Sequence, residues 1–303
     1  MNWGMKTKPQ TIRQFFKQFP DDESCLNHLF EIRFGQGFTC PACERPSKWF
    51  RIKAERAYSC QWCGHHLHPT VGTPFEQTRT PLQLWFYAIF LFTATRNGVA
   101  AKELERQLGV TYKTAWRMAD LIRRHMADVD GDQPVGGEDK IVEIDETWVG
   151  GSLTFRRGDG KSRSQRQNKT LVMGMLERDG DILTTVVAGN RKHDLLPEVV
   201  ENVAPGTTIH TDELRSYKDL PTLGFKHDTV NHSRAYYVSA TGCHVQGIEN
   251  FWAQLKRAIN GTHIHVSGKH LWKYAKEAEY RFNRRDCAQT MLGELLTTFG
   301  PLR

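Results

Sequence analysis

Residues 140–151, KIVEIDETWVGG, carry three carboxylates through a segment that otherwise has the apolar, β-branched composition of a buried strand. The three acids are Glu143, Asp145 and Glu146. An ionised carboxylate taken out of water is costly unless it is paired or bound to a metal, so a strand that keeps one usually has a use for it. The segment therefore indicates a site whose other members must come from elsewhere in the chain.

Two later acids are candidate partners of Asp145. Asp212 ends a predicted strand in TTIHTDELRSY, and Glu249 borders a predicted amphipathic helix over residues 244–261. The inward-facing residues of that helix are Ile248, Phe251, Trp252, Leu255 and Ile259. Any one of these acids alone is most simply a surface or capping carboxylate. Asp145 departs from that interpretation because its strand is apolar. For Asp212 and Glu249, only the order of the predicted strands and helices favours a role in the same site.

A basic residue, Lys256, follows Glu249 by two helical turns. Residues at this spacing lie on the same side of a helix, so Lys256 and Glu249 can face one site.

Four cysteines are spaced as metal ligands. Two CxxC pairs, separated by 16 residues, are linked by a segment with the length of a β-hairpin. The pairs consist of Cys40, Cys43, Cys60 and Cys63. Four such thiolates suit a tetrahedral zinc, which predicts a zinc ribbon. Four unliganded thiols are the alternative. Because the ligands leave no open position, this zinc would be structural, stabilising the segment by on the order of 10 kcal/mol.

The remaining cysteines and the histidines beside the ribbon have simpler interpretations. The other cysteines, Cys25, Cys243 and Cys287, lack partner spacing, so we expect ordinary buried thiols. Three histidines follow the last CxxC pair, namely His65, His66 and His68. They are in principle able to displace a cysteine, but four cysteines already complete the zinc shell. We interpret them as surface or DNA-contacting groups.

Residues 98–126 have the pattern of two helices joined by a tight turn. Gly109 can end the first helix, and Thr111 is placed to cap a second helix with apolar residues on one side. This pattern predicts a helix-turn-helix, whose second helix would present Tyr112, Lys113, Thr114 and Arg117 to the DNA major groove. We expect Arg123, Arg124 and His125 to extend this basic face. A plain helical hairpin is the alternative, and Glu105 stands where such motifs favour a small residue.

From residue 140 the pattern changes to that of an α/β domain. Three strand-like runs are followed by a helix in LLPEVVENVAPG and by the strand that ends at Asp212. This order predicts a mixed sheet with helices on its faces. The Gly-rich, acidic residues 129–140 are expected to be the linker before it.

The motifs resemble the ISXO-like group of bacterial insertion-sequence transposases. The resemblance covers the zinc ribbon and the segments VGTPFEQTRTPLQLW, IDETWVGG, HTDELRSY, HVQGIENFWAQLKRAINGTHIHVS and KHLWKYAKEAEYRFNRRD. It implies a multidomain protein with a zinc ribbon, a helix-turn-helix and an α/β RNase H-like catalytic core, a mixed five-stranded sheet with helices. The expected domains are residues 1–75 (N-terminal helix and zinc ribbon), 76–128 (helix-turn-helix), 138–290 (catalytic core) and 291–303 (C-terminal tail).

The resemblance also implies the catalytic residues. Asp145, Asp212 and Glu249 would bind two Mg²⁺ (or Mn²⁺) ions, and Lys256 would lie toward the DNA backbone. Water would first cut the end of the insertion sequence, and the freed 3′-hydroxyl would then attack target DNA. Glu249 is preferred over its neighbour Asn250 because a carboxylate binds hard cations better than an amide does. Glu143 and Glu146 are expected in support, with Glu146 on the opposite face of the strand from Asp145.

Composition favours a polyanionic partner. Lys and Arg outnumber Asp and Glu by 41 to 34, a net charge of +7. A basic loop over residues 155–169 would add phosphate contacts through Arg156, Arg157, Lys161 and Arg163. A solvated surface turn, which charged runs usually are, is the alternative. Composition thus favours a nucleic-acid partner. The resemblance implies that the partner is double-stranded DNA (element terminal repeats and target DNA), with a homodimer or larger assembly to join two ends.

No membrane partner is expected. The longest apolar run, residues 84–94, has 11 residues, against roughly 20 for a bilayer span. The basic N-terminus leads into polar residues rather than an apolar signal core, so we expect a cytoplasmic protein. The resemblance implies that it is bacterial and, with DNA as its partner, nucleoid-associated.

Two other functions use the same features. A metal-dependent DNA nuclease or resolvase would use the same acids without strand transfer, and a catalytically silent regulator would use only the DNA-binding modules. The retained acids and Lys256 argue against the regulator. Two DNA-binding modules ahead of the core favour recognition of defined ends over simple cutting.

Overall fold

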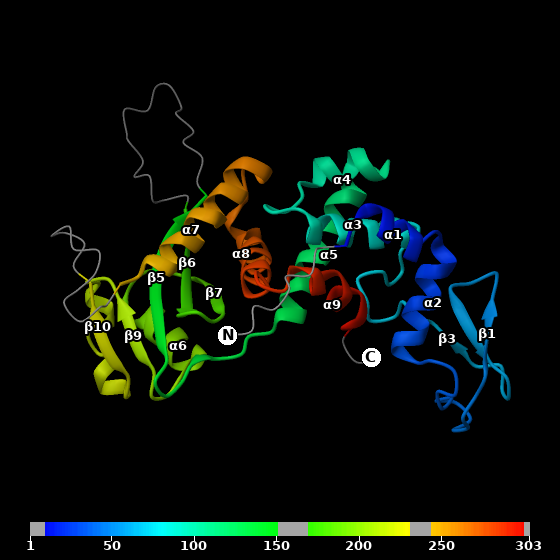
Figure 1. Cartoon of the computed structure of the whole chain (residues 1–303), viewed down its shortest axis with the longest axis horizontal. Helices are drawn as coiled ribbons and strands as arrows, with labels where there is room; N and C mark the ends of the chain where they lie inside the picture. Colours follow the sequence, from blue (N-terminus) through cyan, green and yellow to red (C-terminus); the bar gives the residue numbers. More distant parts are fainter. Residues whose placement is uncertain (1–9, 151–168, 231–243, 300–303) are drawn as a thin grey trace. The chain divides into compact units, whose positions relative to one another are not determined.

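The chain forms two compact units in the computed structural model, which describes residues 10–150, 169–230 and 244–299 (Figure 1). Unit 1 comprises Met1–His125 together with Cys287–Arg303, and unit 2 comprises Met126–Asp286. The C-terminal segment therefore belongs to the unit that the N-terminal part of the chain builds.

Unit 1 is mainly helical. Its helices are α1 (Ile12–Gln18), α2 (Asp22–Arg33), α3 (Leu82–Ala94), α4 (Ala101–Leu108), the larger part of α5 (Tyr112–Asp130), η5 (Ala288–Thr290) and α9 (Met291–Thr297). Helix α3 is the apolar run of the sequence, and both α2 and α9 pack against it. Thr11 and Asp21 begin α1 and α2 with capping boxes, which satisfy backbone N–H groups that have no partner within the helix.

A small three-stranded antiparallel sheet in unit 1 carries the cysteines. Its strands, in the order β1-β2-β3, are β1 (Trp49–Ile52), β2 (Ala57–Cys60) and β3 (His66–Leu67). The CxxC pairs stand beside these strands, as a ribbon requires. The N-terminal zinc-ribbon architecture is thus present.

Helices α4 and α5 follow the pattern expected from the sequence. Gly109 ends α4 in the left-handed conformation, with φ of 65°, and the hydroxyl of Thr111 accepts a hydrogen bond from the N–H of Thr114 at the start of α5. The apolar side of α5 is fully buried. It is formed by Ala115, Met118, Ala119 and Ile122. Helix α5 continues to Asp130, and a short strand, β4 (Val135–Gly136), occupies part of the expected linker.

Unit 2 is built on a mixed five-stranded sheet, whose strand order is β10-β9-β5-β6-β7. The strands are β5 (Ile141–Val149), β6 (Thr170–Glu177), β7 (Ile182–Val187), β9 (Thr208–Thr211) and β10 (Lys226–Thr229). Strands β5, β6 and β7 pair antiparallel, whereas β9 is parallel to both β5 and β10. The pair β4 and β8 (Val203–Ala204) forms a separate two-stranded sheet.

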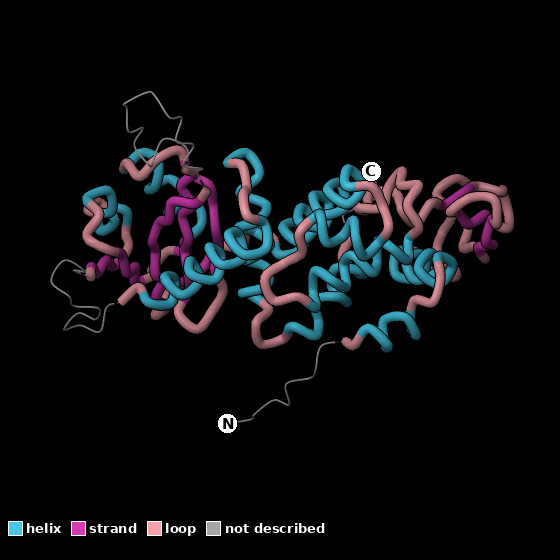
Figure 2. The backbone as a smooth tube through the Cα atoms, turned by 90° about the horizontal axis from the view of Figure 1, so that it is seen from above, coloured by secondary structure: helices cyan, strands magenta, loops and turns pink. Residues whose placement is uncertain are grey.

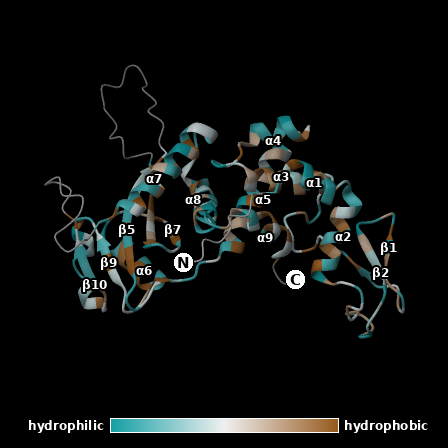
Figure 3. Ribbon diagram, viewed as in Figure 1, coloured by the Kyte–Doolittle hydropathy of each residue, from teal (hydrophilic) through white to brown (hydrophobic). Residues whose placement is uncertain are grey.

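Helices cover both faces of the five-stranded sheet (Figure 2). Alternate residues of β5 and β6 supply two separate apolar clusters, because successive side chains of a strand point to opposite faces. One cluster includes α6 (Lys192–Asn202), η1 (Arg215–Tyr217) and η2 (Leu220–Leu223). The other includes α7 (Gln246–Ala258), η4 (Ile259–His263) and α8 (Gly268–Asn283). The apolar composition of the sheet interior is visible in Figure 3.

Among the described residues, no helix combines the length and the apolar character that crossing a membrane requires.

Candidate functional site

Strand β5 divides its acids between the two faces of the sheet. Val142 and Ile144 belong to the cluster with α6, so Glu143 and Asp145 point to the face covered by α7. Contacts agree with this alternation, since the indole Nε1–H of Trp252 on α7 donates to Asp145 Oδ2 at 3.0 Å. Glu146 points to the opposite face, where it accepts a hydrogen bond from the hydroxyl of Tyr217.

The parallel pairing of β5 with β9 brings Asp212 beside Asp145. Glu143 pairs with His210, and the same register continued by two residues puts Asp212, the residue directly after β9, level with Asp145. Neighbouring strands lie about 4.8 Å apart, and residues at the same register point to the same face. Asp212 is partly buried and its Oδ1 accepts a hydrogen bond from the N–H of Leu214, which turns the chain away from the sheet.

Helix α7 supplies the third acid. Glu249 lies in its first turn and is exposed, and Lys256 is exposed two turns later. The inward residues predicted from the sequence are all buried in the cluster on this face, but α7 ends at Ala258 and Ile259 belongs to the following turn η4. The acids of the strands and of the helix are therefore carried on elements that pack directly against each other.

The electrostatics of the site reflect burial and crowding of like charges. Burial raises the pKa of Asp145 to about 6, and the charges of Asp212 and Glu249 raise it as well. On the other face, burial together with the charges of Asp145 and Asp212 raises the pKa of Glu146 to about 8. The charges of Asp212 and Glu249 thus act on Asp145. Within the described residues the predicted acids do not form so tight a group as the four cysteines, whose ligand atoms all lie within 4.8 Å of one another.

A glycine makes room for the indole that holds Asp145. Gly174 on β6 pairs with Asp145, and a Cβ atom at this position would lie 2.8 Å from the ring of Trp252. Any side chain here would displace the indole and break its hydrogen bond to the carboxylate. The sequence showed Trp252 as an inward-facing residue of α7 but contained no signal for this polar contact.

Glu143 forms a buried polar cluster that anchors the start of α7. Its side chain is only 2% exposed, and Oε1 lies 3.2 Å from Arg178 Nη2 and 3.2 Å from His244 Nδ1. Its Oε2 accepts a hydrogen bond from the backbone N–H of Ile248 at 3.1 Å. Arg178 also contacts His210 Nδ1 at 3.2 Å. Glu143 therefore ties β5, β9 and α7 together one pleat away from Asp145.

Sequence reasoning missed most of this supporting cluster. Arg178 lies in the turn after β6, outside every quoted motif. His210 and His244 begin the segments HTDELRSY and HVQGIENF, but no spacing in the sequence linked either of them to Glu143. The sequence did show one unusual feature of this cluster, the carboxylate of Glu143 in an apolar strand. In the structure its charged partner is Arg178.

The four cysteines have the geometry of a zinc site. Their Sγ atoms lie within 4.8 Å of one another, with 3.6 Å from Cys40 to Cys63 and 3.9 Å from Cys43 to Cys60. A tetrahedron with zinc–sulfur bonds of about 2.3 Å has edges of about 3.8 Å. The hydroxyl of Ser47 donates to Cys60 Sγ at 3.2 Å, a contact that would orient this ligand. The cluster therefore fits one structural Zn²⁺.

The candidate DNA-binding residues on α5 are accessible. Lys113 and Arg117 are exposed and Thr114 is partly exposed, while the neighbouring aromatic residues Tyr112 and Trp116 are 50% and 40% exposed. These side chains share one side of the start of α5.

The expected extension of this basic face is wrong for two of its three residues. Arg123 is buried and donates to the carbonyl of Val99, and His125 is buried with Nε2 at 2.9 Å from the carbonyl of Leu295. Only Arg124 is exposed. Their positions on α5 point them into the helical core, which their charged character did not reveal.

Other sequence predictions receive only partial answers. Arg156, Arg157, Lys161 and Arg163, as well as Cys243, lie outside the described residues. Cys25 is buried as expected, whereas Cys287 is only partly buried.

These features define a protein with a four-cysteine zinc ribbon and an α/β unit that gathers acids on adjacent strands and a covering helix. The chain belongs to the ISXO2-like transposase family, because the ISXO2-like transposase domain matches residues 135–283 and the transposase zinc-ribbon domain matches residues 20–66.

Relatives are consistent with this assignment. An uncharacterized protein in transposable element ISH50 of Halobacterium salinarum is 26% identical over 281 residues, covering 88% of this chain and 92% of the relative. An uncharacterized transposase-like protein of Haemophilus influenzae is 34% identical over 108 residues, covering 35% of this chain and 83% of the relative.

A comparison with solved structures gives only a weak match. The simian T-cell lymphotropic virus intasome in complex with PP2A regulatory subunit B56 gamma shares 11% identity, with a TM-score of 0.28, over 58% of this chain and 63% of that chain. A similarity at this level carries no argument about the present fold.

Proposed function

We propose that this chain is a DNA transposase that cuts the ends of an insertion sequence and joins them to target DNA, using Asp145, Asp212 and Glu249 as metal ligands. The family supports transposition as the activity. The strand order of unit 2, three antiparallel strands followed by a helix and a parallel strand, supports an RNase H-like core.

The observation that carries the proposal is the register of β5 and β9. It brings Asp145 and Asp212 side by side on one face of the sheet, and α7, with Glu249 in its first turn, packs on that face. Local structure alone does not require that three carboxylates from three different elements meet on one face of a sheet.

The residues present fit Mg²⁺ or Mn²⁺. Carboxylate oxygens are the ligands that such hard cations prefer, and the charges of Asp212 and Glu249 both act on Asp145. Bound there, the ions would activate an attacking oxygen and stabilise the leaving oxygen of a phosphodiester.

The chain's own residues hold and orient this site. The indole of Trp252 fixes the Asp145 carboxylate through its hydrogen bond, and Glu143 fixes the start of α7 and so the position of Glu249. Lys256, exposed on the same helix, is suited to contact a DNA phosphate.

DNA recognition is assigned to unit 1. The zinc ribbon and the α4–α5 pair, interpreted as a helix-turn-helix, would bind the terminal repeats, with Lys113, Thr114 and Arg117 toward the DNA. Because joining two ends requires two bound ends, the active assembly on DNA would be a homodimer or larger.

The test is cleavage of a plasmid that carries the complete element with its flanking DNA. The Asp145→Asn and Asp212→Asn variants should lose Mg²⁺-dependent nicking at the element ends by at least about a hundredfold, because each lacks a metal ligand. Both should still bind DNA. Asp181→Asn, which changes an exposed acid in the turn between β6 and β7, is the matched control and should cleave normally.

Other outcomes separate the competing functions. Nicking without any joined product from the unaltered protein would identify a nuclease or resolvase. Specific DNA binding without cleavage would identify a regulator. Retained cleavage in Asp145→Asn would remove the assignment of the site.

A further inference from the structure

A second group of metal-binding side chains lies on the zinc ribbon, outside the four cysteines. Its members are Glu55, His66 and His68, whose possible ligand atoms all lie within 4.8 Å of one another. The imidazole Nδ1 of His66 is 3.5 Å from Glu55 Oε2. These three side chains have no part in the proposed DNA chemistry, and they are separate from the four thiolates.

The backbone of the ribbon accounts for this grouping. His66 and His68 are two residues apart along the third strand and its extension, so their side chains point to the same face. Strand β2 pairs antiparallel with β3, with Ser59 opposite His66, which brings the β1–β2 turn and Glu55 alongside. The group is therefore formed by strand pairing that the ribbon already requires.

The spacing of the donor atoms suits a transition-metal ion. A tetrahedral ion with bonds of about 2.0–2.1 Å to imidazole nitrogen and carboxylate oxygen has ligand atoms about 3.4 Å apart. The observed 3.5 Å between His66 and Glu55 is close to this value. All three side chains are exposed, so they can adjust their rotamers without disturbing a packed core.

We propose that Glu55, His66 and His68 form a second metal site, which binds Zn²⁺ or a similar divalent transition ion. Two imidazoles and one carboxylate are a donor set that suits zinc. With three protein ligands, the ion keeps at least one position for water or for an anionic oxygen. The four-cysteine site differs because its shell is complete.

The experiment counts zinc bound per chain. The full chain, freed of metal under reducing conditions and titrated with Zn²⁺ in excess Mg²⁺, which occupies the proposed catalytic acids, is expected to bind two zinc ions per chain at micromolar free zinc. The His66→Ala/His68→Ala variant should bind one. His65→Ala is the matched control and should bind two, because alternation turns His65 away from His66 and its backbone carbonyl, not its side chain, pairs with Cys60.

Cobalt distinguishes the two sites. Co²⁺ bound to thiolates gives intense sulfur-to-metal charge-transfer absorption, whereas nitrogen and oxygen ligands do not. The His66→Ala/His68→Ala variant should keep the thiolate absorption and should no longer bind a second equivalent of Co²⁺. Glu55→Gln should weaken binding of this second ion by at least about tenfold.

Two results would overturn the proposal. One is an unaltered protein that binds a single ion, and the other is a double variant that still binds two. If the double variant binds no zinc, the Glu55→Gln variant decides. Loss of one ion from Glu55→Gln, with the thiolate absorption retained, supports the second site. Binding of two ions by Glu55→Gln, as in the unaltered protein, overturns the proposal. None of these readouts depends on DNA cleavage, so they are independent of the proposed transposase activity.

Discussion

At the scale of single residues, one strand assigns three different environments to three acids. Asp145 is held by an indole N–H beside Asp212, Glu143 is ion-paired under the start of α7, and Glu146 is bonded to Tyr217 on the other face. Side chains of a strand alternate between the two faces of the sheet. Glu143 and Asp145, two residues apart, therefore share one face, and Glu146, directly after Asp145, lies on the other. A buried carboxylate in a strand is thus no sufficient sign of metal binding.

The Glu143 pair is expected to contribute strongly to stability. Glu143→Gln leaves the Arg178 guanidinium without its carboxylate, and breaking a partly buried ion pair of this kind should lower the free energy of unfolding by about 3 kcal/mol. Denaturant unfolding of the purified protein measures this change. The exposed Glu138→Gln, close to the start of the same strand, should stay within about 0.5 kcal/mol of the unaltered protein.

A double variant gives the second check on this pair. Glu143→Gln combined with Arg178→Met removes both charges and should recover part of the loss. If the double variant is destabilised by the sum of the two single changes, the pair is not coupled and the interpretation fails.

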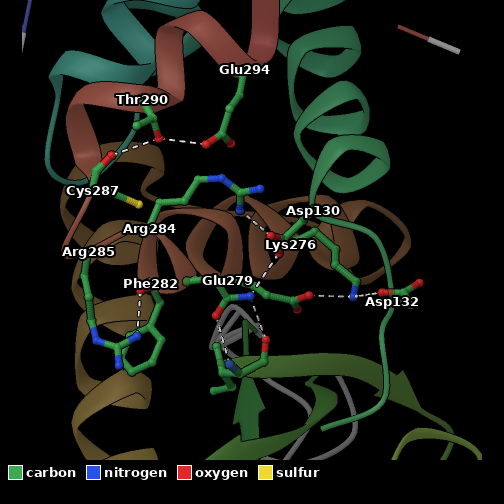
Figure 4. A network of polar contacts seen from close by, with 12 residues as sticks. Asp130, Asp132, Lys276, Glu279, Phe282, Arg284, Arg285, Cys287, Thr290 and Glu294 are labelled. Atoms are coloured by element: carbon green, nitrogen blue, oxygen red, sulfur yellow. Dashed lines mark hydrogen bonds and ion pairs between the residues drawn. The ribbon is translucent and has the colours of Figure 1, made fainter. Parts of the chain in front are cut away.

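At the scale of elements, α8 is fastened to the sheet and to the end of α5 by a polar network within unit 2. Figure 4 shows Lys276 between Asp132 and Glu279, with distances of 2.5 and 2.9 Å. Glu279 Oε2 also accepts hydrogen bonds from the backbone N–H and the hydroxyl of Thr184 on β7. The second group of contacts joins Asp130 to Arg284 and Asn283.

Glu279 should make stability depend on pH. Burial raises the pKa of Glu279 from 4.5 to about 7, although the charge of Lys276 opposes this shift. The folded state therefore holds the proton more tightly than the unfolded state, and this contribution is fully present below pH about 4.5 and is lost as the pH rises through about 7.

Comparison with Glu279→Gln isolates this effect from other titrating groups. The free energy of unfolding of the unaltered protein, relative to this variant, should fall by about 3 kcal/mol between pH about 4.5 and 7. Asp130, whose pKa is also raised by burial, is common to both proteins. Exposed Glu201→Gln is the control and should follow the unaltered protein at each pH. A constant difference across this range would contradict the shift of Glu279.

Helix α5 is the element on which DNA contact is expected. Lys113→Ala and Arg117→Ala should each weaken binding to element-end DNA. Each lost phosphate contact should also reduce the slope of the logarithm of the binding constant against the logarithm of the salt concentration by about one. Binding isotherms at several salt concentrations measure both quantities. Lys17→Ala, an exposed cation on α1, is the control in the same unit, and an equal effect there would indicate general charge attraction rather than contact by α5.

At the scale of the whole molecule, the zinc site and the acids belong to different units, so loss of one should leave the other folded. Cys40→Ser removes a ligand from the four-cysteine cluster and should unfold the ribbon. The variant should lose the zinc held by thiolates and bind element ends more weakly, while unit 2 keeps its structure. Metal analysis, and hydrogen exchange of β5 and β6, report on the two parts. Unchanged thiolate-bound zinc would count against the four-cysteine site.

The sequence by itself determined the parts of this protein whose signals are local. The CxxC spacing predicted the ribbon, the apolar strands and helical periods predicted the mixed sheet with its helices, and the alternation of β5 predicted opposite faces for Asp145 and Glu146. The family assignment followed from several motifs in a fixed order, and it is confirmed.

Only the tertiary structure decided which side chains meet. Arg178 and His244 reach Glu143 from positions 35 and 101 residues away, respectively, and Trp252 reaches Asp145 across 107 residues. Arg123 and His125 were expected on a basic surface but lie in the helical core. Such contacts depend on the register between strands and on how helices pack across the sheet, and neither is encoded in the spacing of nearby residues.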